Sequence, residues 1–197
     1  MTLAELISAV YDITKRPDRV QETNSAIKSA TLKAHQFDFL VRDIFETGIN
    51  FGTPNYVNNL DYKTVIPRFR VPKYLRKYDY TNSAPGDFLT KLTPEQILDR
   101  YNTQKQDVYY VAGQYIQINS STQDQYYLFG CYIDPDISDA SFTSWIANDF
   151  PYCIVYYAAA IVEIGLGKLD EAKLHQALGE DEKSRIVIQD ISLRTSV

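Results

Sequence analysis

Three aspartates in one short segment are the strongest candidates for chemistry in this sequence. Asp134, Asp136 and Asp139 lie in the segment DPDISD, and clustered carboxylates can bind Mg²⁺ or Ca²⁺. The glycine and the terminal glutamate of an EF-hand loop are missing from this segment. Because Asp and Pro are also common turn residues for backbone reasons, the pattern favours a turn and leaves a metal site as the alternative.

The two histidines have no neighbours at the spacing of a metal or catalytic motif. His35 and His175 do not lie beside Cys, Asp or Glu in a pattern such as H-E-x-x-H. We interpret the first as a helix-end residue and the second as an exposed helix residue. Serine nucleophile elbows and glycine-rich phosphate loops are also missing from the sequence. We therefore predict no catalytic residue, no cofactor and no metal, in a protein that is not an enzyme.

A basic and aromatic segment raises the question of nucleic-acid binding. RFRVPKYLRKYDY (68–80) mixes cations with aromatic side chains, as binders of single-stranded nucleic acid do, although an exposed strand face explains the mixture as well. The net charge of -5 argues against a protein that grips nucleic acid, because phosphate contacts need a surplus of Lys and Arg. It allows a surface that DNA slides past without binding.

The two cysteines suggest packing rather than chemistry. Cys131 and Cys153 are too few for a disulfide framework and do not have the spacing of a metal site. Both lie in apolar runs, LFGCYI and PYCIVYY. We therefore predict two buried thiols.

The most apolar stretch predicts a helix inside a bundle. FPYCIVYYAAAIVEIGLGK (150–168) has 13 residues before its first charge at Glu163, whereas a bilayer core requires about 20 apolar residues in a helix. Pro151 suits a first helical turn. Four small or apolar residues share one helical face: Ile154, Ala158, Ile161 and Gly165. We expect a buried helix and no membrane contact.

Both ends of the chain predict helices. Thr2 and Glu5 form a capping-box pattern at the start of a first helix, and a second helix is expected from Arg19 to His35. The first helix has an apolar stripe of Leu3, Leu6, Ile7, Val10 and Ile13. The residues of the second helix expected to face inward are Val20, Ile27, Ala30 and Ala34.

Beyond the apolar stretch, the C-terminal part predicts charged helices. Helices are expected over 142–147 and over LDEAKLHQALGEDEKSR (169–185). The acidic residues after Gly179 suit the first turn of a renewed helix. RIVIQDISLRTSV (185–197) fits either a helical face or a strand.

The middle of the chain predicts extended structure interrupted by loops. Residues 65–71 alternate as a half-buried strand, and Pro67 and Pro72 place this strand at an edge or a bulge. GINFGTPNYVNNLDY (48–62) is rich in Asn and Gly, so we expect a long loop there.

Four more elements are expected in the second half of this middle region. TPEQILDRY (93–101) predicts a short helix with a capping box. VYYVAGQYIQIN (108–119) predicts a hairpin that turns at Ala112-Gly113. A polar loop, NSSTQD (119–124), is expected to separate it from a strand over 125–133.

The order of helices, then strands, then helices indicates an α+β protein. We expect a helical bundle formed by the N- and C-terminal helices, with a central antiparallel β-sheet domain. The predicted domains are residues 1–36 with 137–197 for the bundle, and 37–136 for the β-rich part. Sixteen tyrosines are too many for one core, and tyrosine is enriched where proteins meet proteins.

The order of elements resembles one family. The chain begins with the helix AELISAVYDI (4–13), and AHQFDF (34–39) gives an aromatic entry to the strand region. SFTSWIANDFPYCIVYYAAAIVEI (141–164) supplies an aromatic helix start and a small-residue helix, and the charged helix over 169–185 follows. In this order the chain resembles the head-to-tail adaptors, or connectors, of short-tailed bacteriophages, the tail tubular protein A family. The central segment 48–106 matches no motif of that family.

The resemblance implies a structural virion protein without catalytic residues. Such a protein forms a homo-oligomeric ring of twelve copies that links the portal protein to the tail nozzle protein. Genomic DNA would pass through the lumen during ejection without specific binding, which suits an acidic surface. The N-terminal residues lack the pattern of a signal peptide, so we expect synthesis in the host cytoplasm and a final place in the virion.

We expect the ring or portal interface to use the last helix. The candidate interface residues are Glu180, Asp181, Glu182, Arg185, Ile188 and Ile191. Two alternatives remain open. One is a small metal-dependent hydrolase or nuclease that uses the aspartates of the DPDISD segment, and the other is a non-viral scaffold protein that uses the tyrosine-rich strands for protein interaction.

Overall fold

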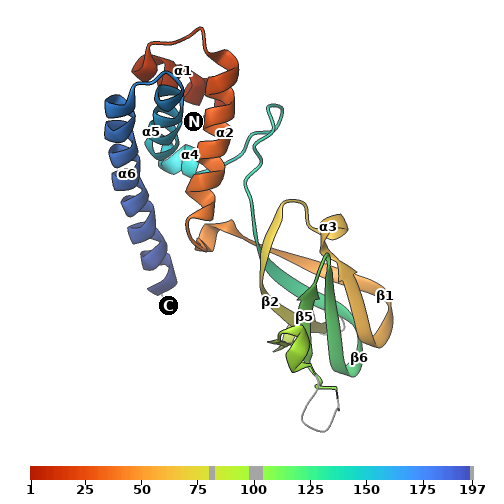
Figure 1. Ribbon diagram of the computed structural model, residues 1–197. Helices are drawn as coiled ribbons and strands as arrows, with labels where there is room; N and C mark the ends of the chain where they lie inside the picture. Colours follow the sequence, from red (N-terminus) through yellow and green to blue (C-terminus); the bar gives the residue numbers. More distant parts are fainter. Residues whose placement is uncertain (80–82, 98–103, 196–197) are drawn as a thin grey trace. The chain divides into compact units, whose positions relative to one another are not determined.

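The computed structural model describes residues 1–79, 83–97 and 104–195, with helices at both ends of the chain and strands between them (Figure 1). The predicted α+β class is confirmed. The chain divides into unit 1, Met1–Asp43 with Asp134–Val197, and unit 2, Ile44–Ile133. Unit 1 extends past both predicted boundaries, which were residues 36 and 137. Near the first boundary, Leu40 is buried in the helical core.

Unit 1 is a bundle built from both ends of the chain. Its elements are α1 (Leu3–Thr14), α2 (Val20–Gln36), the 3₁₀ turn η1 (Val41–Asp43), α4 (Trp145–Asp149), α5 (Pro151–Gly165) and α6 (Leu169–Thr195). The capping box predicted for α1 is confirmed, since the Glu5 amide donates to Thr2 Oγ1 and the Thr2 amide donates to Glu5 Oε2. Among the described residues, no helix is both long and apolar enough to cross a membrane.

The core of unit 1 forms where α1, α2 and α6 pack around α5. Its fully enclosed members include Leu6, Val10, Ile27, Ala30, Ile154, Ala158, Ala159 and Ile186. Small residues in α2 and α5 let the helix backbones approach closely. The prediction that Val20 faces inward was wrong: this first residue of α2 is 57% exposed.

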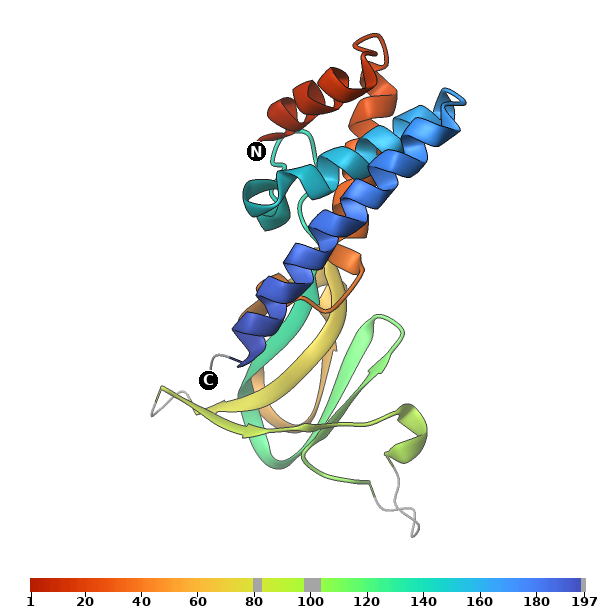
Figure 2. The same cartoon turned by 90° about the vertical axis from the view of Figure 1, so that its left-hand side faces the viewer.

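Helix α6 is one continuous element, so the predicted interruption after Gly179 and the alternative of a C-terminal strand were both wrong. Gly179 is buried inside the helix, and a Cβ there would lie 3.1 Å from the ring of Tyr157. The glycine therefore permits close contact with α5 rather than ending the helix. Figure 2 shows α6 running alongside α5, and its 27 residues exceed the 15 of α5.

Unit 2 is a bent sheet around one long central strand. Its elements are β1 (Ile44–Asp61), the short helix α3 (Tyr62–Val65), β2 (Phe69–Asp79), β3 (Ala84–Phe88), β4 (Thr90–Lys91), the 3₁₀ turn η2 (Pro94–Gln96), β5 (Val108–Ala112) and β6 (Tyr115–Ile133). β6 pairs with β1 on one side, and with β5 and then β2 on the other. The predicted antiparallel arrangement has one exception, because β4 pairs with β5 in parallel.

Two segments predicted as loops are strand. Residues 48–61 belong to β1, and the polar segment 119–124 belongs to β6. They pair with each other, for example Asn55 with Asp124 and Val57 with Asn119. Each segment therefore acquires its strand conformation from a partner distant in sequence, which local propensity does not reveal.

The remaining predictions for this region were partly right. The strand expected over 65–71 begins only at Phe69, because residues 62–65 form α3. The hairpin of β5 and β6 is confirmed, and its turn includes Gly113 at φ +60°. The predicted capping box of the 93–101 helix is present in η2, and residues 98–101 of that prediction lie outside the described part of the chain.

The core of unit 2 is aromatic and aliphatic. Its members are Ile49, Leu60, Ile66, Leu75, Leu89, Tyr109, Ile116, Ile118, Tyr127, Phe129 and Cys131. The prediction of two buried thiols is confirmed, since Cys131 lies in this core and Cys153 in that of unit 1. Burial raises the pKa of Cys131 to about 11 and that of Cys153 to about 12.

Candidate functional site

The six predicted interface residues lie in the C-terminal part of α6. Four of them are exposed, namely Asp181, Arg185, Ile188 and Ile191. The other two, Glu180 and Glu182, are half-buried and pair with Lys183 at 2.6 Å and Arg185 at 2.9 Å. Ion pairs one turn apart on a helix contribute only about 0.2–0.5 kcal/mol each, so a partner can compete for these charges.

Large aliphatic side chains are exposed on α5 and α6. Ile188 is 68% exposed and Ile191 is 52% exposed. Other exposed aliphatic side chains of these two helices are Ile161, Ile164, Leu169, Leu174 and Leu193. One exposed leucine needs no explanation. Several on two adjacent helices indicate a surface that a partner can cover.

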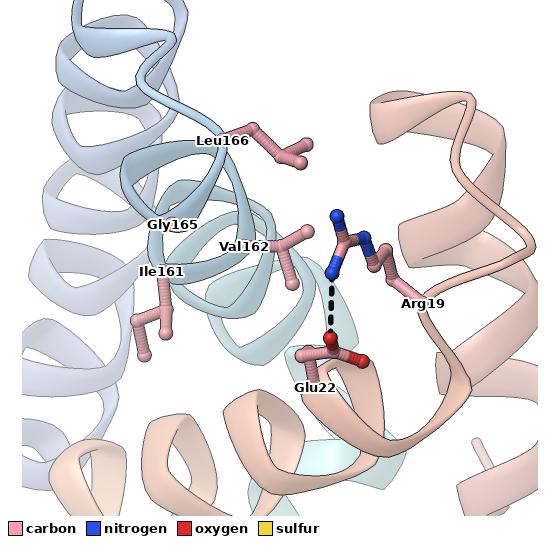
Figure 3. A pocket seen from close by; sticks show the side chains of 6 residues that line it. All are labelled: Arg19, Glu22, Ile161, Val162, Gly165 and Leu166. Atoms are coloured by element: carbon pink, nitrogen blue, oxygen red, sulfur yellow. Dashed lines mark hydrogen bonds and ion pairs between the residues drawn. The ribbon is translucent and has the colours of Figure 1, made fainter.

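A hollow of about 270 Å³ lies between α2 and α5 (Figure 3). Ile161, Val162 and Leu166 give it an apolar wall, and the ion pair between Arg19 and Glu22 stands on the opposite side at 2.8 Å. The hollow combines an apolar wall with a charged rim. This combination suits a protein side chain better than a small polar substrate.

The three aspartates of the candidate metal site serve as separate hydrogen-bond acceptors. Asp134 accepts from the side-chain amide of Gln36, and Asp139 pairs with Lys28 at 2.9 Å. Asp136 accepts hydrogen bonds from two serines of its own turn. In the described part of the chain, no group of three or more His, Cys, Asp and Glu residues could hold a metal. The contacts favour the turn interpretation.

His35 belongs to a buried polar network. The ring lies in the last turn of α2, with Nδ1 2.7 Å from Asp43 Oδ1 and Nε2 2.8 Å from Ser144 Oγ. Trp145 Nε1 also donates to Asp43 Oδ1, at 2.8 Å. The His35, Asp43 and Ser144 residues are at most 7% exposed.

A serine, a histidine and an aspartate joined by hydrogen bonds in this way also form a catalytic triad, in which the histidine activates the serine. Here, however, Ser144 Oγ is buried and accepts the Ala147 amide at 3.1 Å as the N-cap of α4. With its proton on Nδ1, the ring donates to Asp43 and accepts the hydroxyl of Ser144. We interpret the trio as a structural tie between α2, η1 and α4, since a nucleophile must reach its substrate.

The second histidine also differs from its prediction. His175 was expected to be an exposed helix residue, but it is half-buried and its Nδ1 lies 2.7 Å from Glu163 Oε2. Glu163 is only 2% exposed. The ring also stacks on Tyr156, with 6.1 Å between centroids. His175 therefore joins α6 to α5 and provides a partner for a buried carboxylate.

The outer face of the sheet in unit 2 carries a cluster of cations and aromatic rings, which we call the outer cluster: Arg70, Lys73, Tyr74, Arg76, Phe88 and Tyr132. Two bulges in β2 insert Arg70 and Lys73 as extra residues opposite β6. Both cations lie over the ring of Tyr132, at 5.6 and 5.7 Å from its centroid. Bulges re-aim side chains in this way.

Tyr74 is the centre of the outer cluster. Its ring covers Gly130, where a Cβ would lie 2.3 Å from the ring, and its hydroxyl donates to Glu46. Burial and this hydrogen bond raise the pKa of Tyr74 to about 12. Phe88, 62% exposed, meets the Tyr74 ring edge to face. The predicted exposed strand face is therefore present, with most of its charges engaged in contacts to rings and carboxylates.

Neither protein-family models nor curated proteins match this chain. The comparisons therefore leave the predicted resemblance to adaptors untested.

Sequence reasoning missed the His35 network because its partners are far apart in the chain. Ser144 lies 109 positions after His35, and Asp43 follows a turn whose geometry no local pattern specifies. The one local signal was the N-cap role of Ser144 before a helix, and a cap serine is usually structural.

Proposed function

We propose that this protein is a structural virion protein, a subunit of the head-to-tail adaptor ring that links the portal to the tail and forms part of the DNA channel. The observation that carries the proposal is the exposed aliphatic surface of α5 and α6, with Ile188 at 68% and Ile191 at 52%. A ring subunit must bury such surface against neighbours. The order of sequence motifs supports the proposal, because helical segments precede and follow the strand region along the chain.

Ring closure places a demand on the subunit surface. A cyclic assembly uses two different patches, so that each copy binds the next in the same direction. Unit 1 offers a convex candidate in the exposed end of α6 and a concave one in the hollow beside Arg19. These features support a self-associating subunit, in which the portal and tail nozzle proteins would bind the remaining faces of the ring.

The proposal is tested by mixing the purified protein with portal protein from the same virus. We expect rings by negative-stain electron microscopy and co-sedimentation with portal particles. An Ile188→Asp variant should lose at least tenfold in affinity, because it places a charge in an apolar contact. Val65→Asp is the matched control, since Val65 is 43% exposed on α3 of unit 2.

Reversing the charges of Glu180, Asp181 and Glu182 should disturb assembly more than the melting temperature, because the ion pairs of Glu180 and Glu182 lie within α6 itself. If the variant unfolds at a clearly lower temperature and its assembly falls to a similar extent, these charges serve the fold rather than the interface, and the prediction is wrong. Failure of the native chain to bind either portal or tail particles would reject the adaptor role. In that case the exposed tyrosines of the strands, Tyr56 on β1 and Tyr115 on β6, favour the alternative of a scaffold protein outside a virion.

A further inference from the structure

In the part of the chain that the structure describes, the sheet of unit 2 ends at β1 on one side of β6, and at β3 and β4 on the other. Among the described residues, β1 pairs with β6 alone, so β1 forms one edge along its whole length (Figure 1). On the opposite side, β3 pairs with β2 alone. The strand order across this part of the sheet is therefore β1, β6, β2, β3, and the outer strands are β1 and β3.

The β1 edge has little protection against pairing. Edge strands are commonly protected by Lys and other charges or by Pro. In Ile44–Asn50 the one charged side chain is Glu46, which already pairs with Tyr74 and Arg76 of β2. Pro54 lies in the irregular section after Asn50, where the Asn50 side chain accepts the Gly52 amide. The section Ile44–Asn50 is free of this irregularity and pairs in unbroken register with β6.

Strand directions allow the two edges to join between copies. β1 is antiparallel to β6, β6 to β2, and β2 to β3, so β3 runs antiparallel to β1. A second copy placed beside the first in the same orientation therefore brings its β1 next to β3 in antiparallel fashion. This contact joins two different patches, as a cyclic assembly requires.

One row of residues indicates the register of the contact. Gly48 lies opposite Leu128, Leu128 opposite Arg76, and Arg76 opposite Phe88, so this row crosses all four strands on one face. At one end Phe88 is 62% exposed. At the other end, no heavy atom lies within 4 Å of a Cβ placed on Gly48.

An aromatic ring over a glycine already stabilises this same face. Tyr74 of β2 covers Gly130 of the neighbouring strand β6. Aromatic cover of a glycine in an adjacent strand is a known way to fix register, especially at edges. Phe88 of one copy can cover Gly48 of the next in the same manner, and cross-strand aromatic contacts contribute roughly 0.2–1 kcal/mol each.

We propose that residues 86–88 of β3 in one copy pair antiparallel with residues 48–50 of β1 in the next copy, with Phe88 over Gly48, so that neighbouring sheets join edge to edge. The occupant of the β1 edge is thus a second copy of this chain. The inference rests on the self-association contained in the proposed function, and it adds a contact between strands of unit 2 to the contact proposed for unit 1. An extended strand is the natural occupant, because its backbone groups complement those of an edge.

The pairing is tested by engineered disulfides. Residues directly opposite in an antiparallel pair have Cα atoms about 4.5–5.5 Å apart, which lies within disulfide reach. A Gly48→Cys, Phe88→Cys double variant should give a ladder of covalent multimers on a non-reducing gel after mild oxidation. The native Cys131 and Cys153 are fully buried and should not react. Asn50→Cys with Gly86→Cys tests the same register while it keeps Phe88.

Controls separate this register from random collision. Each single variant can form dimers at most, and Val65→Cys with Phe88→Cys should give no ladder. A Gly48→Lys variant, which puts a charge on the edge, should weaken self-association at least tenfold in sedimentation velocity, whereas Val65→Lys should not. Circular dichroism checks that each variant is folded.

Each outcome decides between the two proposals. A ladder from the matched pairs alone supports the β3–β1 contact. Folded matched variants that give no ladder, or the same ladder as the mismatched pair, overturn it. If protein without a ladder still binds portal particles, only the strand pairing is wrong. If the ladder forms and portal binding fails, the pairing stands and the adaptor role is wrong.

Discussion

Replacing His35 with alanine should selectively destabilise unit 1. The imidazole is 2% exposed and links Asp43, on η1, to Ser144, the N-cap of α4. His35→Ala removes both contacts at once. It leaves a buried carboxylate without the ring nitrogen at 2.7 Å, although Trp145 still donates to Asp43.

The expected loss follows from the burial of this network. Removing the partner of a buried charge destabilises a protein by about 3–5 kcal/mol, and a domain has only about 5–15 kcal/mol of stability in total. We therefore expect His35→Ala to lower the free energy of unfolding of unit 1 by about 3–5 kcal/mol. With a urea m-value of about 1–3 kcal/mol/M, the midpoint should fall by about 1–5 M.

The chain supplies its own probe for this measurement. Trp145 is the only tryptophan and lies in unit 1, so its fluorescence during urea unfolding reports that unit. A Gly130→Ala change in unit 2 is the control and should leave the Trp145 transition in place, because the two units have separate cores. A loss below about 1 kcal/mol for His35→Ala would refute the view that the network ties the bundle together.

Three further results are expected. Gly130→Ala should destabilise unit 2 by about 1–3 kcal/mol, measured by circular dichroism in urea, because its Cβ would lie 2.3 Å from the Tyr74 ring; an unchanged midpoint would contradict this. Burial acts to raise the pKa of Asp107, but hydrogen bonds from Lys77, 2.8 Å away, and from a serine outweigh it and hold the pKa at about 2. A carboxyl with a depressed pKa stabilises above its unfolded value of 3.8 and loses that stabilisation as the pH falls towards 2, so unit 2 should weaken between about pH 4 and pH 2, and less steeply in Lys77→Met. Neither buried thiol should react with Ellman's reagent at pH 8 until denaturant is added; rapid labelling of the native protein would place a thiol at the surface.

Helices were predictable where a single segment carries its own signals. The capping box at Thr2, the proline at the start of α5 and the small residues of that helix are local, and the structure has all three. The exception is Gly179, which reads as a helix end in sequence. Its role depends on the ring of Tyr157 on another helix, so no local pattern could have shown it.

Strands were predictable only where both members of a pair looked like strands. The β5 and β6 hairpin combined two apolar runs with a nearby turn. The Asn- and Gly-rich part of β1 and the polar part of β6 each resemble loops, and they lie some sixty residues apart when they pair. Because the hydrogen bonds of one satisfy the backbone of the other, their strand conformation is a property of the pair. The His35 network was missed for the same reason, since its members come from three separate segments.

The charge argument changes once the charges are assigned to the two units. Unit 1 has 17 acidic and 11 basic residues, whereas unit 2 has 8 acidic and 9 basic residues. The net charge of -5 is thus the sum of an acidic helical unit and a nearly neutral sheet unit. If the chain forms a DNA channel, repulsion of phosphates can come only from surfaces of unit 1.

A lumen lined by the outer cluster would instead attract DNA, since Lys73 is exposed and lies beside Arg70 over the Tyr132 ring. We expect weak binding of assembled rings to duplex DNA at 50 mM salt, measured by fluorescence anisotropy, and no change in Lys73→Glu. Asp170→Lys, an exposed position of the acidic unit outside the candidate interface residues, should strengthen binding, because it reverses a charge that repels phosphate. Binding that is weakened by Lys73→Glu and unaffected by Asp170→Lys would place the DNA path on the sheet, and the argument that the channel surface repels DNA would then fail.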